Sequence, residues 1–184
     1  ACDLTRVVSF SITPGGGGPT YPFLTRASGA AIDKNDHDAS HLFPTEYPNG
    51  PPDADPLETY TLITRWKVQQ FASLLQRLDA VNEGAGRLLD RCAVVAYSEL
   101  SNGAGHFVRS LPVLVAGGLG GMATGRHLTF PCRRAPGASM SHCVNDAAVL
   151  DRPLADLWLT ALHAVGVEAP AFGNSTGTLS GLWV

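Results

Sequence analysis

The chain has 184 residues, a length that suits one domain with a real hydrophobic core and is short for two. Apolar residues make up 45% and charged residues 16%, and the net charge is -3 with Lys and Arg scattered along the sequence. This balance excludes a nucleic-acid-binding surface, which needs clustered basic residues, and no apolar run is long enough for a bilayer-spanning helix.

The first predicted element is a strand over residues 4–12, whose sequence LTRVVSFSI is β-branched and apolar and is typical of a buried strand. Residues 13–56 then form a long irregular excursion rich in Gly, Pro, Asn and Asp. Irregular segments of this length are uncommon in a compact domain and are often functional. The excursion is therefore the first place to look for a site.

A helix is predicted from residue 56 to about residue 78, because apolar residues recur there at three- and four-residue steps. Pro56 suits the first turn of a helix, and the sequence NEGAG ends the pattern. The side chains predicted to pack against a sheet are Leu57, Tyr60, Phe71, Leu74 and Leu78.

Two further strands are predicted over residues 92–100 and 111–119, and a second amphipathic helix over 152–167. Strands that alternate with helices favour an α/β fold: a layered, largely parallel sheet flanked by helices, in one domain covering residues 1–184. In such a sheet, ligands bind beyond the carboxyl ends of the strands. The loops after the two strands are therefore candidate site loops.

The four cysteines bear on the redox setting. Cys132 and Cys143 bracket a short loop rich in Pro, Gly and Ser, which favours a local disulfide and an extracellular or periplasmic protein. Buried free thiols are the alternative, and Cys2 and Cys92 pair with each other or stay free. The first residues, ACDLTRVVSF, have no leader pattern, so we expect a mature form or part of a longer chain.

The stretch DKNDHDASHLFP, residues 33–44, holds the first candidate site. His37 and His41, with Asp36 or Asp38, are residue types that bind a divalent metal such as zinc. Oxygen ligands from the aspartates and Asn35 would suit calcium instead, although the EF-hand pattern is incomplete. The alternative is a solvated loop whose aspartates cap turns.

The two loops after the predicted strands hold further candidates. The first contains Ser98, Glu99, Ser101, Asn102 and His106, but no GxSxG elbow that would mark a nucleophilic serine. The second contains His127, with Arg126 beside it as a partner for a phosphate or sulfate. Its GGLGG run lacks the lysine and spacing of a nucleotide-binding loop and indicates a turn.

Several segments taken together resemble a known family: LTRVVSF, DASH, WKVQQFASLLQRLDAVNEGAGRLLD, AYSELSNGAGH, LPVLVAGG, TGRHLTFP and FGNSTGTLSGL. In this order they are similar to the C-terminal half of a secreted bacterial family numbered 1552 among the domains of unknown function. That family is distantly similar to sulfatase-like proteins of the alkaline-phosphatase superfamily. The resemblance covers nearly the whole chain and implies part of an alkaline-phosphatase-like fold.

The resemblance also implies site residues, and the match is incomplete. The family's histidine-rich segment is matched at His37, Ser40 and His41 but has Asp36 and Leu42 at its outer positions. In the next loop the matching residues are Ser98, Ser101, Gly103, His106, Leu111 and Pro112, whereas Asn102 replaces an aspartate and Val108 a histidine. The GRH of Gly125, Arg126 and His127 is intact.

Two functional hypotheses follow. In the first, the chain is a secreted, non-catalytic structural or binding subunit that assembles with copies of itself or with a separate N-terminal half. In the second, it is a metal-dependent hydrolase of phosphate or sulfate esters, with a divalent metal, zinc or calcium, as cofactor. The implied metal ligands are His37, His41, Asp38, His106 and His127, and the implied substrate contacts are Arg126, Ser98 and Asn102. The depleted polar positions favour the first hypothesis.

Overall fold

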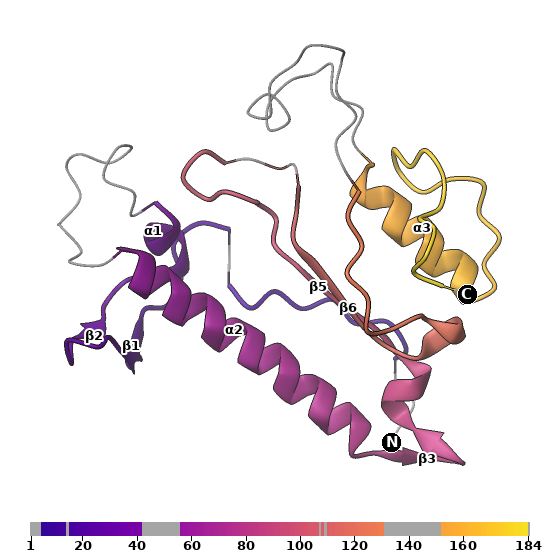
Figure 1. Cartoon of the computed structure of the whole chain (residues 1–184), viewed down its shortest axis with the longest axis horizontal. Coiled ribbons are helices and arrows are strands. Elements are labelled where there is room, and N and C mark those ends of the chain that lie inside the picture. The colour runs from indigo at the N-terminus through magenta and orange to yellow at the C-terminus, as the bar shows by residue number, and fades with distance from the viewer. Residues whose placement is uncertain are drawn as a thin grey trace, which may run out of the picture. The chain divides into compact units, whose positions relative to one another are not determined.

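The computed structural model describes residues 5–13, 15–41, 56–106, 108, 110–130 and 152–183 (Figure 1). The chain divides into two compact units. Unit 1 comprises Ala1–Gln70 and Gly103–Gly105, and unit 2 comprises Phe71–Asn102 and His106–Val184. The predicted Cys132–Cys143 disulfide lies outside the described residues, as does Cys2.

Unit 1 contains a short hairpin and a short helix inside the excursion that was predicted to be irregular. Strand β1 (Tyr21–Thr25) pairs antiparallel with β2 (Ala31–Ile32), and α1 spans Asp36–Ser40. The hairpin turn closes through backbone bonds of 2.9 Å from Arg26 N to Ala30 O and from Gly29 N to Arg26 O. The excursion is therefore partly ordered by local turn chemistry that composition does not reveal.

The core of unit 1 is a cluster of four buried side chains from four elements: Tyr21, Ile32, Ala39 and Ile63. Trp66 packs against this cluster, and its ring meets the Tyr21 ring edge-on at a centroid distance of 5.5 Å. Edge-to-face ring pairs add to the free energy of burial. This cluster holds α1 and the first half of the long helix together.

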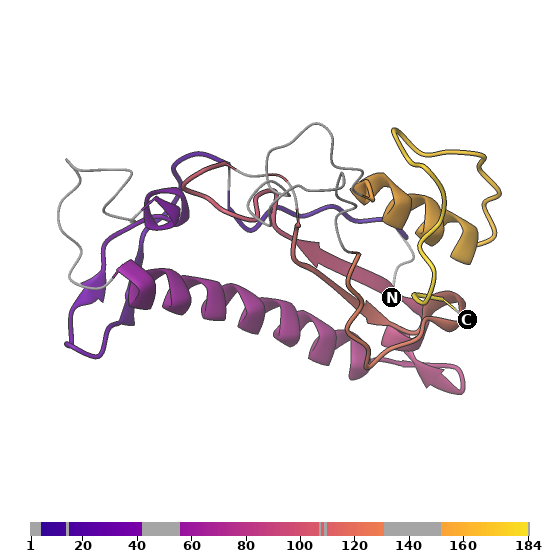
Figure 2. The ribbon, with the colours of Figure 1, turned by 45° about the horizontal axis from the view of Figure 1, so that its top comes forward.

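The long helix α2 (Pro56–Asp79) confirms the predicted helix and its start at Pro56 (Figure 2). The prediction of which side of this helix is buried is wrong. Thr59 and Ile63 are the buried residues, whereas Leu57 and Leu74 are 68% and 46% exposed. Apolar residues occur on several sides of this helix, so periodicity alone did not identify the side that unit 1 buries.

Unit 2 is built around an antiparallel hairpin. Strands β5 (Ala93–Tyr97) and β6 (Val113–Gly117) pair from Ala93 opposite Gly117 to Tyr97 opposite Val113. A smaller hairpin, β3 (Asn82–Glu83) with β4 (Gly86–Arg87), and the 3-10 helix η1 (Leu88–Arg91) precede it.

The predicted layered, largely parallel sheet is therefore wrong. The sheets among the described residues are two-stranded and antiparallel. The strands over 93–97 and 113–117 lie where the sequence predicts strands, but the described residues between β5 and β6 contain no helix. A parallel pair needs a crossover, usually helical, whereas a loop that turns back gives an antiparallel pair.

Residues 5–12, which we term the apolar arm, are also not the buried strand that was predicted. All eight are exposed, and in the described structure none belongs to a strand. The alternating apolar pattern of Val8, Phe10 and Ile12 favours a strand. A strand also needs a neighbouring strand to which its backbone can hydrogen-bond. The arm is part of unit 1 and is followed by Thr13, which bonds with Asp36 and Lys67.

The second predicted helix is confirmed as α3 (Leu154–Ala164), preceded by the 3-10 helix η2 (Leu119–Gly121). Leu157 and Leu159 are buried, and Trp158 meets Tyr97 edge-on at 5.9 Å. No helix in the described ranges is long and apolar enough to cross a membrane.

Residues 172–183 are held on α3 and η2 mainly by hydrogen bonds. Asp156 is fully buried: its Oδ1 accepts from the Thr176 backbone N–H at 2.6 Å, and its Oδ2 pairs with Arg152 Nε at 2.8 Å. Leu179 N–H donates to Thr160 Oγ1 at 2.7 Å. Trp183 Nε1 donates to the Leu119 carbonyl oxygen at 2.8 Å. A buried carboxylate with charged and neutral donors around it is a structural network.

Candidate functional site

The N-terminus of α1 is closed by reciprocal side-chain hydrogen bonds. Asn35 is the N-cap, and its Oδ1 accepts from the Asp38 backbone N–H at 2.8 Å. Its Nδ2 donates to Asp38 Oδ2, also at 2.8 Å. Side chains of this type satisfy the unpaired N–H groups of a first turn. Asp38, a predicted metal ligand, is therefore part of a helix cap.

Asp36 is engaged in a second polar cluster. Its Oδ2 forms an ion pair with Lys67 of α2, and it accepts a hydrogen bond from Thr13 Oγ1 at 3.3 Å. Lys67 Nζ also donates to Thr13 Oγ1 at 3.2 Å. The three side chains tie the base of the apolar arm to α1 and α2. Thr13 and Lys67 were not predicted, because partners 23 and 54 residues apart leave no local pattern in the sequence.

His37 and His41 lie together at the end of α1. Their rings are 4.7 Å apart between centroids, with an angle of 62° between the planes. Ser40 Oγ donates to the His37 carbonyl oxygen at 2.7 Å, and the His41 side chain is buried. Four-residue spacing places both imidazoles on one side of a helical turn, as a two-histidine metal site requires.

Part of the second predicted loop also lies in unit 1, next to α1. Gly103 contacts Ser40 so closely that a Cβ at residue 103 would overlap the Ser40 side chain. Two segments that the sequence marked as candidates, 33–44 and 98–106, therefore meet at the Ser40–Gly103 contact. Gly103 is required there because only a residue without a side chain leaves room for this approach.

Tyr21 adds a buried polar atom to unit 1. Among the residues that the structure describes, its hydroxyl is buried and has no hydrogen-bond partner. Burial, and then the negative charge of Asp36, raise the pKa of this phenol above its ordinary value. Both effects disfavour the phenolate, so Tyr21 stays protonated and is no general base near neutral pH.

The other candidate residues belong to unit 2. Ser98 Oγ accepts from the Leu100 backbone N–H at 3.3 Å, which closes a local turn. His106 is exposed and has a left-handed backbone (φ 51°), and His127 is exposed. Arg126 donates to the Gly181 carbonyl oxygen at 3.3 Å. Asn102 is exposed at the start of the turn that contains His106.

Within each unit, the described residues contain no group of three or more His, Cys, Asp or Glu side chains placed to hold a metal ion. His37, His41 and Asp38 belong to unit 1, whereas His106 and His127 belong to unit 2. Cys92, also in unit 2, is a free thiol whose pKa is raised by burial and then by Glu83. A raised pKa lowers the thiolate fraction, so Cys92 is a poor nucleophile.

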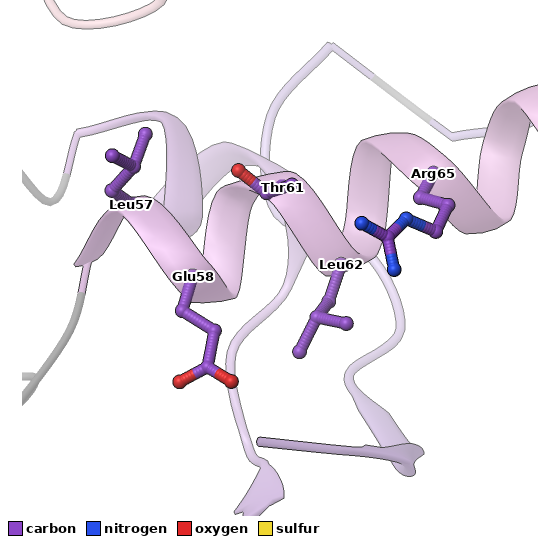
Figure 3. A pocket seen from close by; sticks show the side chains of 5 residues that line it. All are labelled: Leu57, Glu58, Thr61, Leu62 and Arg65. Carbon is purple, nitrogen blue, oxygen red and sulfur yellow. The ribbon is translucent and has the colours of Figure 1, made fainter. Parts of the chain in front are cut away.

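A shallow hollow of about 290 Å³ lies along the first turns of α2 (Figure 3). Its lining residues are Leu57, Glu58, Thr61, Leu62 and Arg65, all from one helix. Glu58 Oε1 accepts from the Ala27 backbone N–H at 2.6 Å and so serves the β1–β2 turn. A ligand pocket encloses most of its ligand between several elements, so this hollow does not have the form of a substrate site.

Comparison with known proteins gave no relatives: no family model matches the chain, and no match was found among curated proteins or solved structures.

The most unusual feature of the described surface is apolar. In the arm, Val7, Val8 and Phe10 are 87%, 77% and 82% exposed. Contiguous exposed apolar residues mark protein–protein or membrane contact sites, whereas single ones need no explanation. The arm is thus a second candidate site, one for association. The sequence signal was present, but it was interpreted as a strand buried in the chain's own sheet.

Proposed function

We propose that this chain is a non-catalytic structural subunit that associates with further copies of itself. The observation that carries the proposal is the apolar arm, whose large side chains are exposed along a contiguous stretch. Covering these side chains in an interface would recover roughly 1.5–3 kcal/mol for each one fully buried. In a single chain these side chains stay exposed to water, so the free energy of burying them is not gained.

The polar residues of the candidate site support a structural role. Asp36 pairs with Lys67, and Asp38 bonds with the Asn35 N-cap. Arg126, the proposed anion contact, bonds to a backbone carbonyl. Each of these groups contributes to local folding, as expected of a scaffold. We place this subunit outside the cytoplasm, in line with its resemblance to a secreted family and with the predicted Cys132–Cys143 disulfide.

Sedimentation velocity and light scattering test the proposal. Between about 1 and 100 µM, the average mass should rise above the 19.3 kDa of one chain as mass action populates the assembly. A monodisperse monomer at every concentration would contradict self-association.

A second measurement addresses the alternative of a metal-dependent hydrolase. The purified protein should contain no stoichiometric transition metal by elemental analysis and should not turn over aryl phosphate or aryl sulfate esters. Stoichiometric metal together with turnover that is lost in a His37→Ala variant would replace the non-catalytic proposal with the hydrolase. His163→Ala is the matched control, because that imidazole bonds to the Ala169 carbonyl oxygen at 2.8 Å in unit 2.

A further inference from the structure

We propose that Asn102 and Gly103 form a self-modification site, at which loss of the Asn102 amide releases the tip of the β5–β6 loop from unit 1. Asn102 is exposed, and Gly103 follows it directly. The loop tip consists of Gly103–Gly105, which belong to unit 1. The site is independent of the proposed self-association, because the reaction needs no second chain.

The reaction needs only the chain itself and water. The backbone nitrogen of Gly103 loses its proton and attacks Cγ, the side-chain carbonyl carbon of Asn102. A bond forms between this nitrogen and Cγ, and the bond from Cγ to Nδ2 breaks, so that Nδ2 leaves with a proton as ammonia. Water then opens the five-membered succinimide ring. Opening at Cγ leaves an aspartate, whereas opening at the backbone carbonyl leaves an isoaspartate, whose main chain runs through Cγ.

The residue that follows the asparagine decides where this ring closes fastest. A side chain at that position crowds the approach of the backbone nitrogen, whereas glycine has no side chain and the widest choice of backbone angles. Within the described ranges, Asn102 is the asparagine that precedes a glycine, and the others, Asn35, Asn82 and Asn174, precede Asp, Glu and Ser. The sequence and the exposure of Asn102 therefore assign the reaction to this residue.

The consequence for the fold follows from the contact between the loop tip and α1. Gly103 lies so close to Ser40 that an added Cβ at residue 103 would overlap the Ser40 side chain. An isoaspartate inserts one more carbon into the main chain directly before Gly103, which displaces that residue by about 1.5 Å, the length of one carbon–carbon bond. A contact this close does not survive such a displacement, so the modified tip no longer docks on α1.

Strain in the backbone after the tip favours the same outcome. His106 has a left-handed backbone with a φ of 51°, a conformation that persists only where the surrounding structure holds it. Release of the tip allows this residue to return to an ordinary conformation. Because the ammonia is lost, neither product reverts to asparagine, and the release is a one-way change.

The experiment ages the full chain at mildly alkaline pH and maps its peptides by mass spectrometry. Isoaspartate at residue 102, detected with an isoaspartyl methyltransferase, is the signature of the ring, because direct hydrolysis of the amide gives only aspartate. It should form several times faster at Asn102 than at Asn35, Asn82 or Asn174. An equal or slower rate at Asn102 overturns the proposal.

Two variants separate the modification from its consequence. Asn102→Gln keeps a neutral amide but cannot close a five-membered ring, and Asn102→Asp has the charge of the product on a main chain of ordinary length. Hydrogen exchange of α1 and of residues 103–105 measures the docking of the tip. In the aged parent, protection of both segments should fall several-fold in proportion to the isoaspartate formed. Aged Asn102→Gln and fresh Asn102→Asp should keep it.

The remaining outcomes contradict the proposal. The sequence has a second Asn-Gly pair, Asn49–Gly50, which lies outside the described residues. Asn102→Gln retains that pair, so a loss of protection that persists in this variant on ageing arises elsewhere and overturns the assignment to Asn102. Isoaspartate at residue 102 that leaves the exchange of α1 unchanged overturns the release of the tip. Lost protection in fresh Asn102→Asp assigns the effect to charge and overturns the role of the longer main chain.

Discussion

Gly117, the last residue of β6, is placed where no other residue fits. Its φ of 110° lies in a region that side chains disfavour, and an added Cβ would overlap the Cys92 carbonyl oxygen. The next residue, Gly118, approaches the Asp90 backbone similarly, with 2.8 Å from an added Cβ to Asp90 O. The first two glycines of the GGLGG run thus allow close packing of the end of β6 against η1 and the residue after it.

Gly117→Ala should lower the free energy of unfolding by about 3 kcal/mol or more, because backbone strain and steric overlap act together. Gly125→Ala is the matched control: Gly125 also has a positive φ, 70°, but nothing lies within 4 Å of its added Cβ. That variant should lose only about 1–2 kcal/mol. Urea denaturation of both variants measures the difference. Equal losses would show that the overlap with Cys92 relaxes at no cost.

Tyr21 has a buried hydroxyl group that makes no hydrogen bond in the described structure. Tyr21→Phe should leave stability at neutral pH unchanged or raise it by about 1 kcal/mol, because a buried unpartnered hydroxyl is costly. The raised pKa has a second effect. Above the ordinary tyrosine pKa of about 10, the unfolded chain releases this proton before the folded chain does, so stability falls as pH rises.

The phenylalanine variant should therefore lose less stability than the parent between about pH 9 and 11. Thermal unfolding at a series of pH values measures this slope. Tyr97→Phe, at a half-exposed position, serves as the control. A Tyr21→Phe variant that is destabilised at neutral pH would indicate that the hydroxyl has a partner after all.

At the level of elements, α2 shows how packing selects one face among several apolar ones. Thr59 and Ile63 are fully buried, and Thr59 Oγ1 accepts from Arg26 Nε at 2.9 Å. Ile63→Ala should lower the free energy of unfolding by roughly 2–5 kcal/mol through the cavity it leaves. Leu74→Ala, on the predicted face, should cost about 1 kcal/mol or less because the side chain is nearly half exposed. The reverse order in denaturant titrations would restore the predicted face.

Helix α3 carries a buried charge, Asp156, that bonds to residues on both sides of it in the sequence. Asp156→Ala removes the partner of Arg152 and leaves the Thr176 N–H unsatisfied, so it should lower the free energy of unfolding by roughly 3 kcal/mol. Asp156→Asn keeps an acceptor for Thr176 and should lose about half as much. The exposed Glu168→Ala is the control and should change stability by less than about 0.5 kcal/mol. A neutral Asp156→Ala would mean that residues 172–183 are held by other contacts.

For the whole molecule, stability and association should be linked. The described part of the chain buries few large apolar side chains, and the arm leaves several exposed. If folding is completed by self-association, raising the concentration about 100-fold should stabilise a dimer by roughly 2.7 kcal/mol. Differential scanning calorimetry should then show an unfolding midpoint that rises with concentration. Phe10→Lys puts a charge on the apolar arm, so the midpoint of this variant should depend less on concentration, which separates this effect from non-specific aggregation.

How far the sequence predicts this structure depends on whether a feature is local. Helix α2 was located with its first residue because Pro56 and a long periodic run are local signals, and strands β5 and β6 were located by their apolar runs. Strand direction, the buried face of α2 and the Asp36–Lys67 ion pair depend on distant partners and were not predicted. His37 and His41 were identified as neighbours because four residues span one helical turn.

The path of the chain through the two units has a consequence for protease digestion. The polypeptide passes from one unit to the other inside α2, between Gln70 and Phe71, and again on each side of Gly103–Gly105. A single cut between β5 and β6 therefore leaves both units covalently joined through α2, and a cut in α2 leaves them joined through residues 103–105. A cut in α2 gives one fragment, residues 71–184, that contains all of unit 2, and a second, residues 1–70, that lacks Gly103–Gly105. Unit 1 is therefore not released complete as one continuous fragment, so the pieces of a nicked protein should migrate together on a native gel and separate only under denaturing conditions.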